Sequence, residues 1–169
     1  MKPSRKSEAK RCAQCKGTDL QQVTGPHDRK FHLASGETIA FRFDEVPYTV
    51  CGNCGERYYA AGIGSAEDNA MTHELIVRQI RDPAVFKWLR KIAGLKAAEL
   101  GELLEVTPET VSHWENGHHS PERAVWTILD ALAEDGMEGR TTTLDRLRTP
   151  TEPRLPNRPV RLTLKAANG

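Results

Sequence analysis

The chain of 169 residues lacks the features that mark a membrane protein or an enzyme. It contains no run of about 18 apolar residues, so we expect no segment to span a membrane. Only 6% of the residues are aromatic and 38% are hydrophobic, a low share that predicts thin cores or long tails. We find no Ser/His/Asp arrangement, no paired carboxylates and no phosphate-binding loop. We therefore expect no enzymatic activity.

The first residues also lack the apolar stretch that a secretory signal requires. Residues 1–10 are basic, and no apolar run follows their charges. We expect this segment to be a basic arm and the protein to be cytoplasmic. Structural disulfides are rare in a reducing compartment, so the cysteines are not expected to pair as disulfides.

The cysteines are few and occur as two close pairs. Cys12 and Cys15 form one CxxC pair, and Cys51 and Cys54 form the other. Each pair predicts a tight turn that points two sulfurs at one site. Two such turns brought together give the tetrahedral sulfur coordination of structural Zn²⁺ sites. We therefore predict that these four cysteines hold one structural Zn²⁺ ion, and none remains for catalysis.

Other interpretations of the cysteine pairs stay open. Iron in a rubredoxin-like site would use the same four ligands. Two redox dithiols are a further alternative, although a thioredoxin-like CxxC requires a βαβ setting that the sequence does not show. His27 and His32 are rival metal ligands. Their spacing suits a loop better, and the four cysteines already complete a tetrahedral shell.

Short strands are predicted between the cysteine pairs. Residues 37–43 place Ile39, Phe41 and Phe43 on one face at period two. Turn signals interrupt the region at three places: Gly25-Pro26, Ser35-Gly36 and Pro47. About 60 residues bury too little apolar surface to be stable without help, so a metal would hold this unit together. The pattern predicts a small α+β zinc ribbon over residues 11–62.

A short, sharply capped helix is predicted in the second half of the chain. Thr107 suits the N-cap, and Pro108 suits the first helical position. Gly117 offers a left-handed stop. Val111 and Trp114 form the only apolar stripe. The remaining surface is polar, which suits either an ordinary amphipathic helix or insertion into a DNA major groove.

Helical patterns flank this segment on both sides. Residues 95–104 form an amphipathic helix before it, and a longer helix is predicted to start at Ser120-Pro121 and to stop near Gly136. Further upstream, we expect a hinge that ends with Ser65 as a helix N-cap, and another helix that begins at Asp82-Pro83. Two short helices joined by a tight turn and followed by a packing helix form the helix-turn-helix plan.

Residues 83–136 resemble the lambda-repressor-like (XRE) helix-turn-helix family. The resemblance is carried by apolar positions and by one specific run: Leu100, Leu104, Val106, Val111-Ser112-His113-Trp114-Glu115-Asn116-Gly117 and Pro121. It implies an all-α domain that binds double-stranded DNA.

Residues 46–59, together with the earlier CxxC pair and the later helices, resemble the YgiT/MqsA-type family. This resemblance implies a homodimer that represses its own operon at a palindromic operator. Many members are antitoxins whose zinc domain binds an RNase-type toxin, and others are regulators without a toxin. Archaeal multiprotein bridging factors also join a zinc ribbon to such helices and act as coactivators. Their cysteine pairs lie closer together than the 35 residues between Cys15 and Cys51.

The resemblance also implies which residues contact DNA. MqsA-type sequences typically carry Asn and Arg where this chain has Glu109 and His113, so its target sequence should differ. Glu109 can accept a hydrogen bond from cytosine N4, and His113 can donate one to guanine. His118 and His119 either face phosphate or are simply solvated. The full set of expected contacts on bases and backbone is Lys96, Thr107, Pro108, Glu109, Thr110, Ser112, His113, Asn116, Ser120 and Arg123.

The charge distribution complicates this interpretation. Residues 83–136 carry five basic and nine acidic side chains, a net charge of −4, whereas phosphate contacts normally need Lys and Arg. Residues 137–169 carry a net charge of +4. Their prolines predict a mostly extended tail with a short strand at 160–164, either a phosphate-tracking or partner-binding segment or a solubilising tail. The predicted organisation is a basic arm (1–10), the zinc ribbon (11–62), a hinge and connecting helix (63–82), the helix-turn-helix domain (83–137) and a basic Pro-rich tail (138–169).

Overall fold

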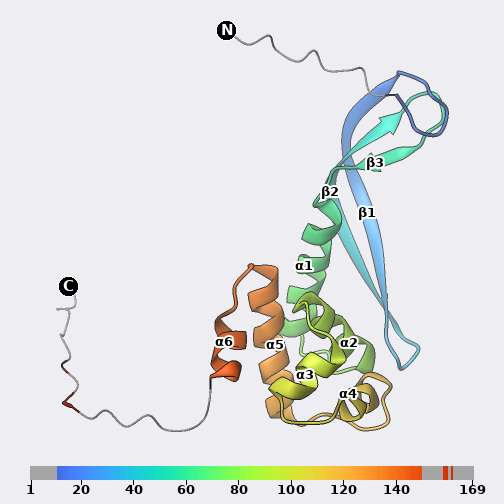
Figure 1. The fold of residues 1–169 in the computed structure, drawn as a ribbon. Coiled ribbons are helices and arrows are strands. Elements are labelled where there is room, and N and C mark those ends of the chain that lie inside the picture. Colours follow the sequence, from blue (N-terminus) through green and yellow to red (C-terminus); the bar gives the residue numbers. More distant parts are fainter. Residues whose placement is uncertain (1–10, 150–157, 160, 162–169) are drawn as a thin grey trace, which may run out of the picture.

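The computed structural model describes residues 11–149, 158–159 and 161. In this part of the chain a long β-hairpin with a third, short strand precedes a group of helices (Figure 1). The strands are β1 (Leu20–His32), β2 (Thr38–Cys51) and β3 (Arg57–Tyr59). The helices are α1 (Ile63–Val77), α2 (Pro83–Ile92), α3 (Ala97–Leu103), α4 (Pro108–Glu115), α5 (Arg123–Met137) and α6 (Thr142–Arg148). The strand predicted at 160–164 lies outside the described residues.

The strands form one antiparallel sheet in the order β1-β2-β3. The hairpin pairing runs from Leu20 opposite Cys51 to His32 opposite Thr38. The predicted turn at Ser35-Gly36 is confirmed, because Gly36 has a φ of 90° and donates its N–H to the carbonyl of Leu33. The hairpin is much longer than a small metal-pinned ribbon needs, and it extends from the cysteines to the helices (Figure 1).

The other two predicted breaks in this region are wrong. Gly25 and Pro26 lie inside β1, where the pairing register shifts between Gly25 and His27. This bulge leaves Pro26 outside the ladder, so its missing N–H costs no hydrogen bond there. Pro47 lies inside β2 opposite Thr24, just before the stretch where β3 pairs. As a result His27 belongs to a strand and not to the loop that its spacing suggested.

The helix α1 also begins earlier than predicted. Its N-cap is Gly62, which has a φ of 91°, and no side chain caps the helix. Ser65 therefore lies inside the first turn, and the prediction of a Ser65 cap is wrong. Only glycine adopts this left-handed conformation readily, so the chain turns sharply from β3 into α1.

The limits of α5 differ from the prediction in the same way. The helix begins at Arg123 after Glu122 and not at Ser120-Pro121. The predicted stop at Gly136 is inside the helix, and Gly139 takes the left-handed conformation beyond its end, with a φ of 65°. A Cβ at Gly136 would come within 2.5 Å of the Ile92 carbonyl oxygen. Gly136 is therefore required for the close packing of α5 on α2.

The Asp82 carboxylate connects the hairpin to the helices. It caps α2 as predicted by accepting from the N–H of Ala84 at 2.8 Å. It also accepts from the N–H groups of Ala34 and Ser35, at 2.9 and 3.4 Å, in the hairpin turn. One side chain thus satisfies free backbone donors of the helix and of the turn.

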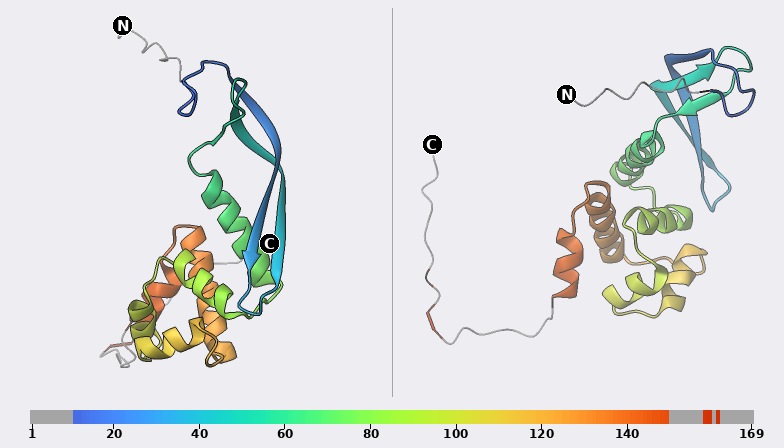
Figure 2. Two further views of the ribbon diagram at one scale, coloured as in Figure 1. Left: turned by 90° about the vertical axis from the view of Figure 1, so that its right-hand side faces the viewer. Right: turned by 45° about the horizontal axis from the view of Figure 1, so that its top comes forward.

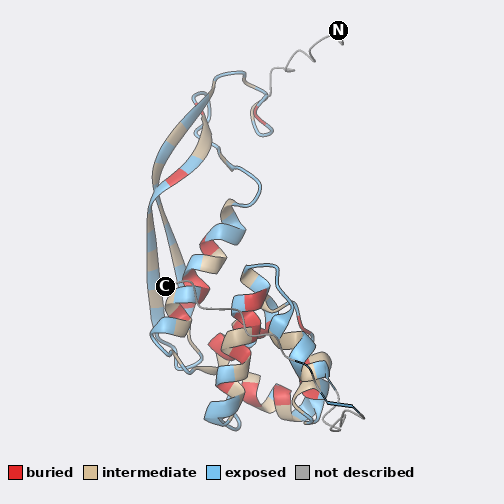
Figure 3. Cartoon of the chain, turned by 90° about the vertical axis from the view of Figure 1, so that its left-hand side faces the viewer, coloured by how far each residue is buried: buried red, intermediate tan, exposed pale blue. Residues whose placement is uncertain are grey.

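The hairpin shares its core with the helices. Phe31 from β1 belongs to the same buried cluster as Met71, Phe86 and Leu129, and its ring meets Trp88 edge to face at 5.5 Å. The predicted apolar face of β2 packs against this cluster with Ile39, Phe41 and Phe43 partly buried. Figure 2 shows α1 lying along the hairpin. In Figure 3 most of the buried residues lie on the helices.

Candidate metal centre and nucleic-acid interface

Two matching turns carry the four cysteines at the far end of the hairpin. In the first turn, the N–H of Lys16 donates to the carbonyl of Cys12 at 2.9 Å. In the second, the N–H of Gly55 donates to the carbonyl of Cys51 at 2.8 Å. Lys16 and Gly55 both have positive φ, at 60° and 75°. This conformation curls each turn so that its two sulfurs point to one side.

The sulfur geometry suits a tetrahedral ion. The Sγ atoms of Cys12 and Cys54 lie 3.6 Å apart, as do those of Cys15 and Cys51. All four sulfurs lie within 4.8 Å of one another. Four sulfurs at about 2.3 Å from a central Zn²⁺ would be roughly 3.8 Å apart, so the residues fit such an ion. The predicted convergence of the four cysteines is confirmed, and His27 is hydrogen-bonded elsewhere.

Neighbouring side chains donate hydrogen bonds to two of these sulfurs. The Tyr58 hydroxyl accepts from the N–H of Ala13 at 2.9 Å and donates to Cys12 Sγ at 3.0 Å. The Asn53 amide donates to Cys15 Sγ at 3.3 Å. A hydrogen bond donated to a cysteine sulfur stabilises the thiolate form and so lowers the pKa of the thiol. The backbone N–H of Cys15 and the Tyr58 hydroxyl lower the pKa of Cys12 to about 6, and Asn53 is the main cause of a lowered pKa at Cys15.

Cys54 differs from the other ligands in its surroundings. The backbone N–H of Glu56 lowers the pKa of the Cys54 thiol, but desolvation and the hydrogen bonding of the Cys54 S–H to the other three cysteine sulfurs outweigh it and raise the pKa to about 12. A metal ion that binds all four sulfurs must displace a proton here, so metal binding should release protons and strengthen as the pH rises.

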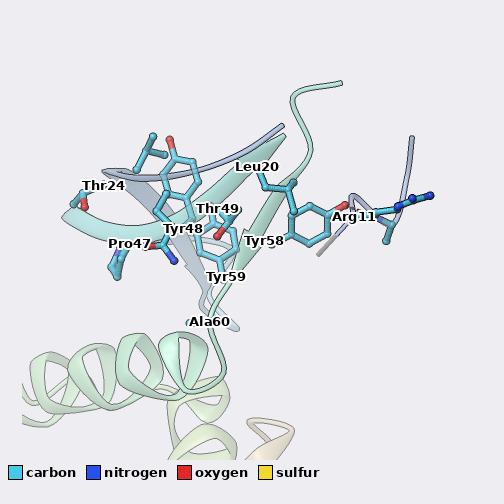
Figure 4. Close-up of a pocket in the computed structure, with 12 residues that line it drawn as sticks. Arg11, Leu20, Thr24, Pro47, Tyr48, Thr49, Tyr58, Tyr59 and Ala60 are labelled. Atoms are coloured by element: carbon cyan, nitrogen blue, oxygen red, sulfur yellow. Dashed lines mark hydrogen bonds between the residues drawn. The ribbon is translucent and has the colours of Figure 1, made fainter. Parts of the chain in front are cut away.

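An aromatic groove of about 670 Å³ lies beside the candidate metal centre, because Tyr58 lines it and its hydroxyl bonds Cys12 Sγ. Figure 4 shows the residues that line the groove. Tyr48, Tyr58 and Tyr59 line it together with Pro47. The guanidinium of Arg57 lies 5.0 Å from the centre of the Tyr48 ring. Aromatic and arginine side chains are enriched at protein interfaces, so this groove is a candidate surface for a protein partner.

An ionic cluster around the buried carboxylate of Glu67 fixes the hairpin against α1. Glu67 is 5% exposed and accepts from His27 Nδ1 at 2.6 Å and from Arg29 at 2.9 Å. Arg29 also donates to Asp68 at 3.0 Å. Burial raises the pKa of Glu67, but the hydrogen bonds from His27 and Arg29 outweigh it and hold the pKa below its ordinary value. The carboxylate is therefore the stable form in the folded protein.

The helix α4 has the polarity expected of a DNA-reading helix. Val111 and Trp114 are buried, and Trp114 meets Phe86 edge to face at 5.6 Å. Thr107 caps the helix by accepting from the N–H of Thr110, as predicted. The side chain of Glu109 is 81% exposed and that of His113 is 40% exposed. The outward face predicted for α4 is therefore present.

A nearly buried ion pair sets the position of α4. Arg90 on α2 donates to the Glu115 carboxylate at 2.5 Å and to the Leu95 carbonyl at 2.6 Å. The side chains of Arg90 and Glu115 are 11% and 8% exposed. Lys87 lies 4.0 Å from the same carboxylate. The pair fixes the C-terminal end of α4 against α2, so it orients the helix without taking part in the exposed face.

The expected DNA contacts are divided between α4 and its neighbours. None of the ten is buried, and only Thr110 and His113 are partly covered. The side chains of four of them already form hydrogen bonds within the protein. The Thr107 hydroxyl caps α4 and bonds the Thr110 hydroxyl at 3.0 Å. The Asn116 amide donates to the carbonyl and the hydroxyl of Ser112, at 2.8 and 3.2 Å. Lys96 precedes α3, and Arg123 begins α5 beside a polar hollow lined by Trp126. Their contact with DNA stays a prediction.

Sequence reasoning missed three groups of residues that shape these sites. Asn53 carries a local signal, because a side-chain amide inside a CxxC turn lies within reach of the sulfurs. Tyr58 carries none, since its position depends on β3 folding back beside the first turn. The pair of Arg90 and Glu115 is also invisible in the sequence, because its members belong to different helices.

Residues 84–138 match the family model described as a helix-turn-helix domain. No curated protein matches the chain. Among the described residues, no helix combines the length and apolarity needed to cross a bilayer. The matched segment covers α2 to α5, which includes the capped helix α4 and its exposed face. Residues 84–138 thus form a helix-turn-helix domain, and this domain indicates a DNA-binding regulator.

Proposed function

We propose that the chain is a zinc-containing, dimeric repressor that binds a palindromic operator in its own promoter. The observation that carries the proposal is the exposed face of α4 within a matched helix-turn-helix domain, with Glu109 and His113 directed outward. Glu109 lies in the first turn of α4, where residues of such a helix reach base edges in the major groove, and His113 lies one turn further along the same exposed face. The two positions would then specify bases, while the surrounding residues contact phosphates.

Specific polar groups support this reading of bases. Glu109 can accept from the N4 amino group of cytosine, and His113 can donate to guanine. The two side chains lie 3.8 Å apart, so they can address neighbouring base pairs. The backbone N–H of Glu109, in the first turn of α4, would favour a nearby phosphate. A second copy of the chain would place a second α4 on the other half of the palindrome.

In this proposal Zn²⁺ is the structural ion of the four cysteines. When bound, it holds the two cysteine turns together at the end of the hairpin. The chain's own residues supply the supporting hydrogen bonds through Tyr58 and Asn53. The iron alternative has the same ligands, and metal analysis of the purified protein distinguishes the two ions.

We further propose that the repressor is an antitoxin that binds an RNase-type toxin. The aromatic groove beside the metal centre supports this role, because it lies at the opposite end of the molecule from α4 (Figures 1 and 4). A toxin in this groove would leave the DNA-reading helix free. A small basic RNase-like protein encoded next to this gene would support the antitoxin role, and co-purification of the two proteins tests it.

A mobility-shift experiment tests the repressor. The full chain is mixed at low salt with DNA from upstream of its own gene. We expect a specific shift that competitor DNA does not remove, and that Glu109→Ala with His113→Ala abolishes. His73→Ala provides the control, because His73 is an exposed histidine on α1 away from this face. No shift with any upstream fragment would count decisively against a repressor.

The charge of the domain favours one other function. Residues 83–136 have a net charge of −4, which is unfavourable for phosphate binding. A coactivator of the multiprotein bridging factor kind contacts other proteins and needs no operator of its own. Binding to a transcription protein without any sequence-specific DNA binding would favour the coactivator. A regulator without a toxin is distinguished by a different result, because it would bind DNA but no RNase.

A further inference from the structure

Three histidines gather at the C-terminal end of α4, and neither the fold nor the metal centre needs them. The ring of His113 lies 5.5 Å from the ring of His118 and 5.6 Å from that of His119, measured between ring centres. Glu109 Oε1 lies 3.8 Å from His113 Nε2. His118 and His119 are exposed, so packing does not explain why these rings meet. We call these four residues the histidine cluster.

The backbone holds the histidine cluster together. Gly117 has a φ of 75° and turns the chain back after α4. The N–H of His118 donates to the carbonyl of His113 at 2.9 Å, which closes this turn. Glu109 and His113 are four residues apart on one face of the helix. His113 therefore has the rings of His118 and His119 and the carboxylate of Glu109 as neighbours before any ligand binds.

The chemistry and spacing of the histidine cluster suit a divalent transition-metal ion. Imidazole and carboxylate are ligands of Zn²⁺ and of related first-row ions. Two imidazoles on one tetrahedral ion at about 2.1 Å place their ring centres roughly 5 Å apart. The rings now meet edge to face, so their nitrogens converge only after rotation between staggered rotamers, which exposed side chains undergo readily.

Competing interactions for the histidine cluster are few. The neighbouring carboxylate of Glu115 is turned inward to Arg90 and does not pair with these rings. Glu109 is 81% exposed, and its carboxylate lies 3.8 Å from the His113 imidazole, which belongs to the same cluster. A bound dication would also offset part of the net charge of −4 that residues 83–136 carry.

We propose that Glu109, His113, His118 and His119 form a second metal site, which binds a divalent transition-metal ion on the DNA-reading helix. The ion would hold Glu109 and His113 away from base edges, so metal would weaken operator binding. This consequence depends on the proposed DNA-binding function. The metal site itself does not, because metal uptake can be measured without DNA.

Equilibrium dialysis of the full chain against Zn²⁺ at pH 7.5 tests the site. The chain is first loaded with one equivalent, which fills the four-cysteine centre. We expect one further equivalent per chain, bound with a saturating isotherm. The double variant His118→Ala/His119→Ala should weaken this second binding at least tenfold, whereas His73→Ala should leave it unchanged. His73 is an exposed histidine outside the histidine cluster, so it controls for nonspecific uptake.

Three results would overturn the site: no uptake beyond one equivalent, uptake that rises without saturation, or a second equivalent that the double variant binds as tightly as the wild type. A mobility shift with and without Zn²⁺ then tests the consequence for DNA. Weaker binding with Zn²⁺ in the wild type but not in the double variant supports it, and equal binding in both overturns it. If no DNA is bound under any condition, the repressor proposal fails while the dialysis result still decides the metal site.

Discussion

Replacing Phe31 with alanine should destabilise the DNA-binding helices although Phe31 belongs to the hairpin. Its side chain is 8% exposed and contacts Trp88 on α2. Removing a buried phenylalanine side chain costs about 3–5 kcal/mol through lost burial and the cavity that remains. We expect a loss of about 3 kcal/mol, because Phe31 lies at the edge of the cluster and neighbours can move into part of the space. That is a large share of a typical unfolding free energy of about 5–15 kcal/mol.

Tryptophan fluorescence reports this effect selectively. Trp88, Trp114 and Trp126 all lie on helices, and the sequence contains three tryptophans. Urea unfolding followed by their fluorescence therefore measures the helical part. The midpoint of the transition is the quantity to compare, since the change next to Trp88 also alters the starting intensity. Heating should show a lower midpoint by roughly 6–12 °C.

Lys30→Ala is the matched control, because Lys30 neighbours Phe31 on the same strand and is exposed. We expect this variant to change the unfolding free energy by less than about 0.5 kcal/mol. A Phe31→Ala transition within about 0.5 kcal/mol of the wild type would refute a shared core. The hairpin would then be a separate unit that merely touches the helices.

Three further perturbations test the sites. Tyr58→Phe should weaken Zn²⁺ binding about tenfold, because Cys12 Sγ loses a hydrogen bond, and competition with a metal indicator measures the loss. Glu115→Ala should destabilise the fold by about 3 kcal/mol, since Arg90 loses its partner, and a double variant with Arg90→Met should recover stability in urea unfolding. Acid should loosen the junction of hairpin and α1. The pKa of Glu67 is lowered in the folded state, so its carboxylate adds to the free energy of unfolding above about pH 4.3, and this stabilisation is lost as the pH falls further. The variant Glu67→Gln should lack this part of the pH dependence of unfolding.

Local chemistry made several elements predictable from the sequence. Asp82 with Pro83 and Thr107 with Pro108 start helices where predicted, because a cap depends only on residues within one turn. Each CxxC turn was predictable for a similar reason, since it is fixed by its own residues. The convergence of the two turns followed from the tetrahedral coordination of a structural metal ion. The inward stripe of α4 followed from helical periodicity alone.

The parts that escaped prediction depend on residues far apart in the chain. The hairpin extends through Pro47 because pairing between strands outweighs the local turn signal. Glu67 meets His27 across 40 positions, so no local pattern reveals that His27 is an ion-pair partner in a strand. Gly136 resembles a helix stop in the sequence, but the approach of α2 explains its place inside α5. Long-range packing decided each of these cases.

Footprinting on the chain's own promoter tests the central claim most directly. Two copies of α4 should protect two half-sites related by a dyad, with centres about one helical turn, or roughly 34 Å, apart. Protection should disappear in Glu109→Ala/His113→Ala and persist in His73→Ala. Protection of such a palindrome is the result that the proposed repressor function predicts. Uniform, sequence-independent protection that the double variant leaves unchanged would contradict a base-reading role for α4.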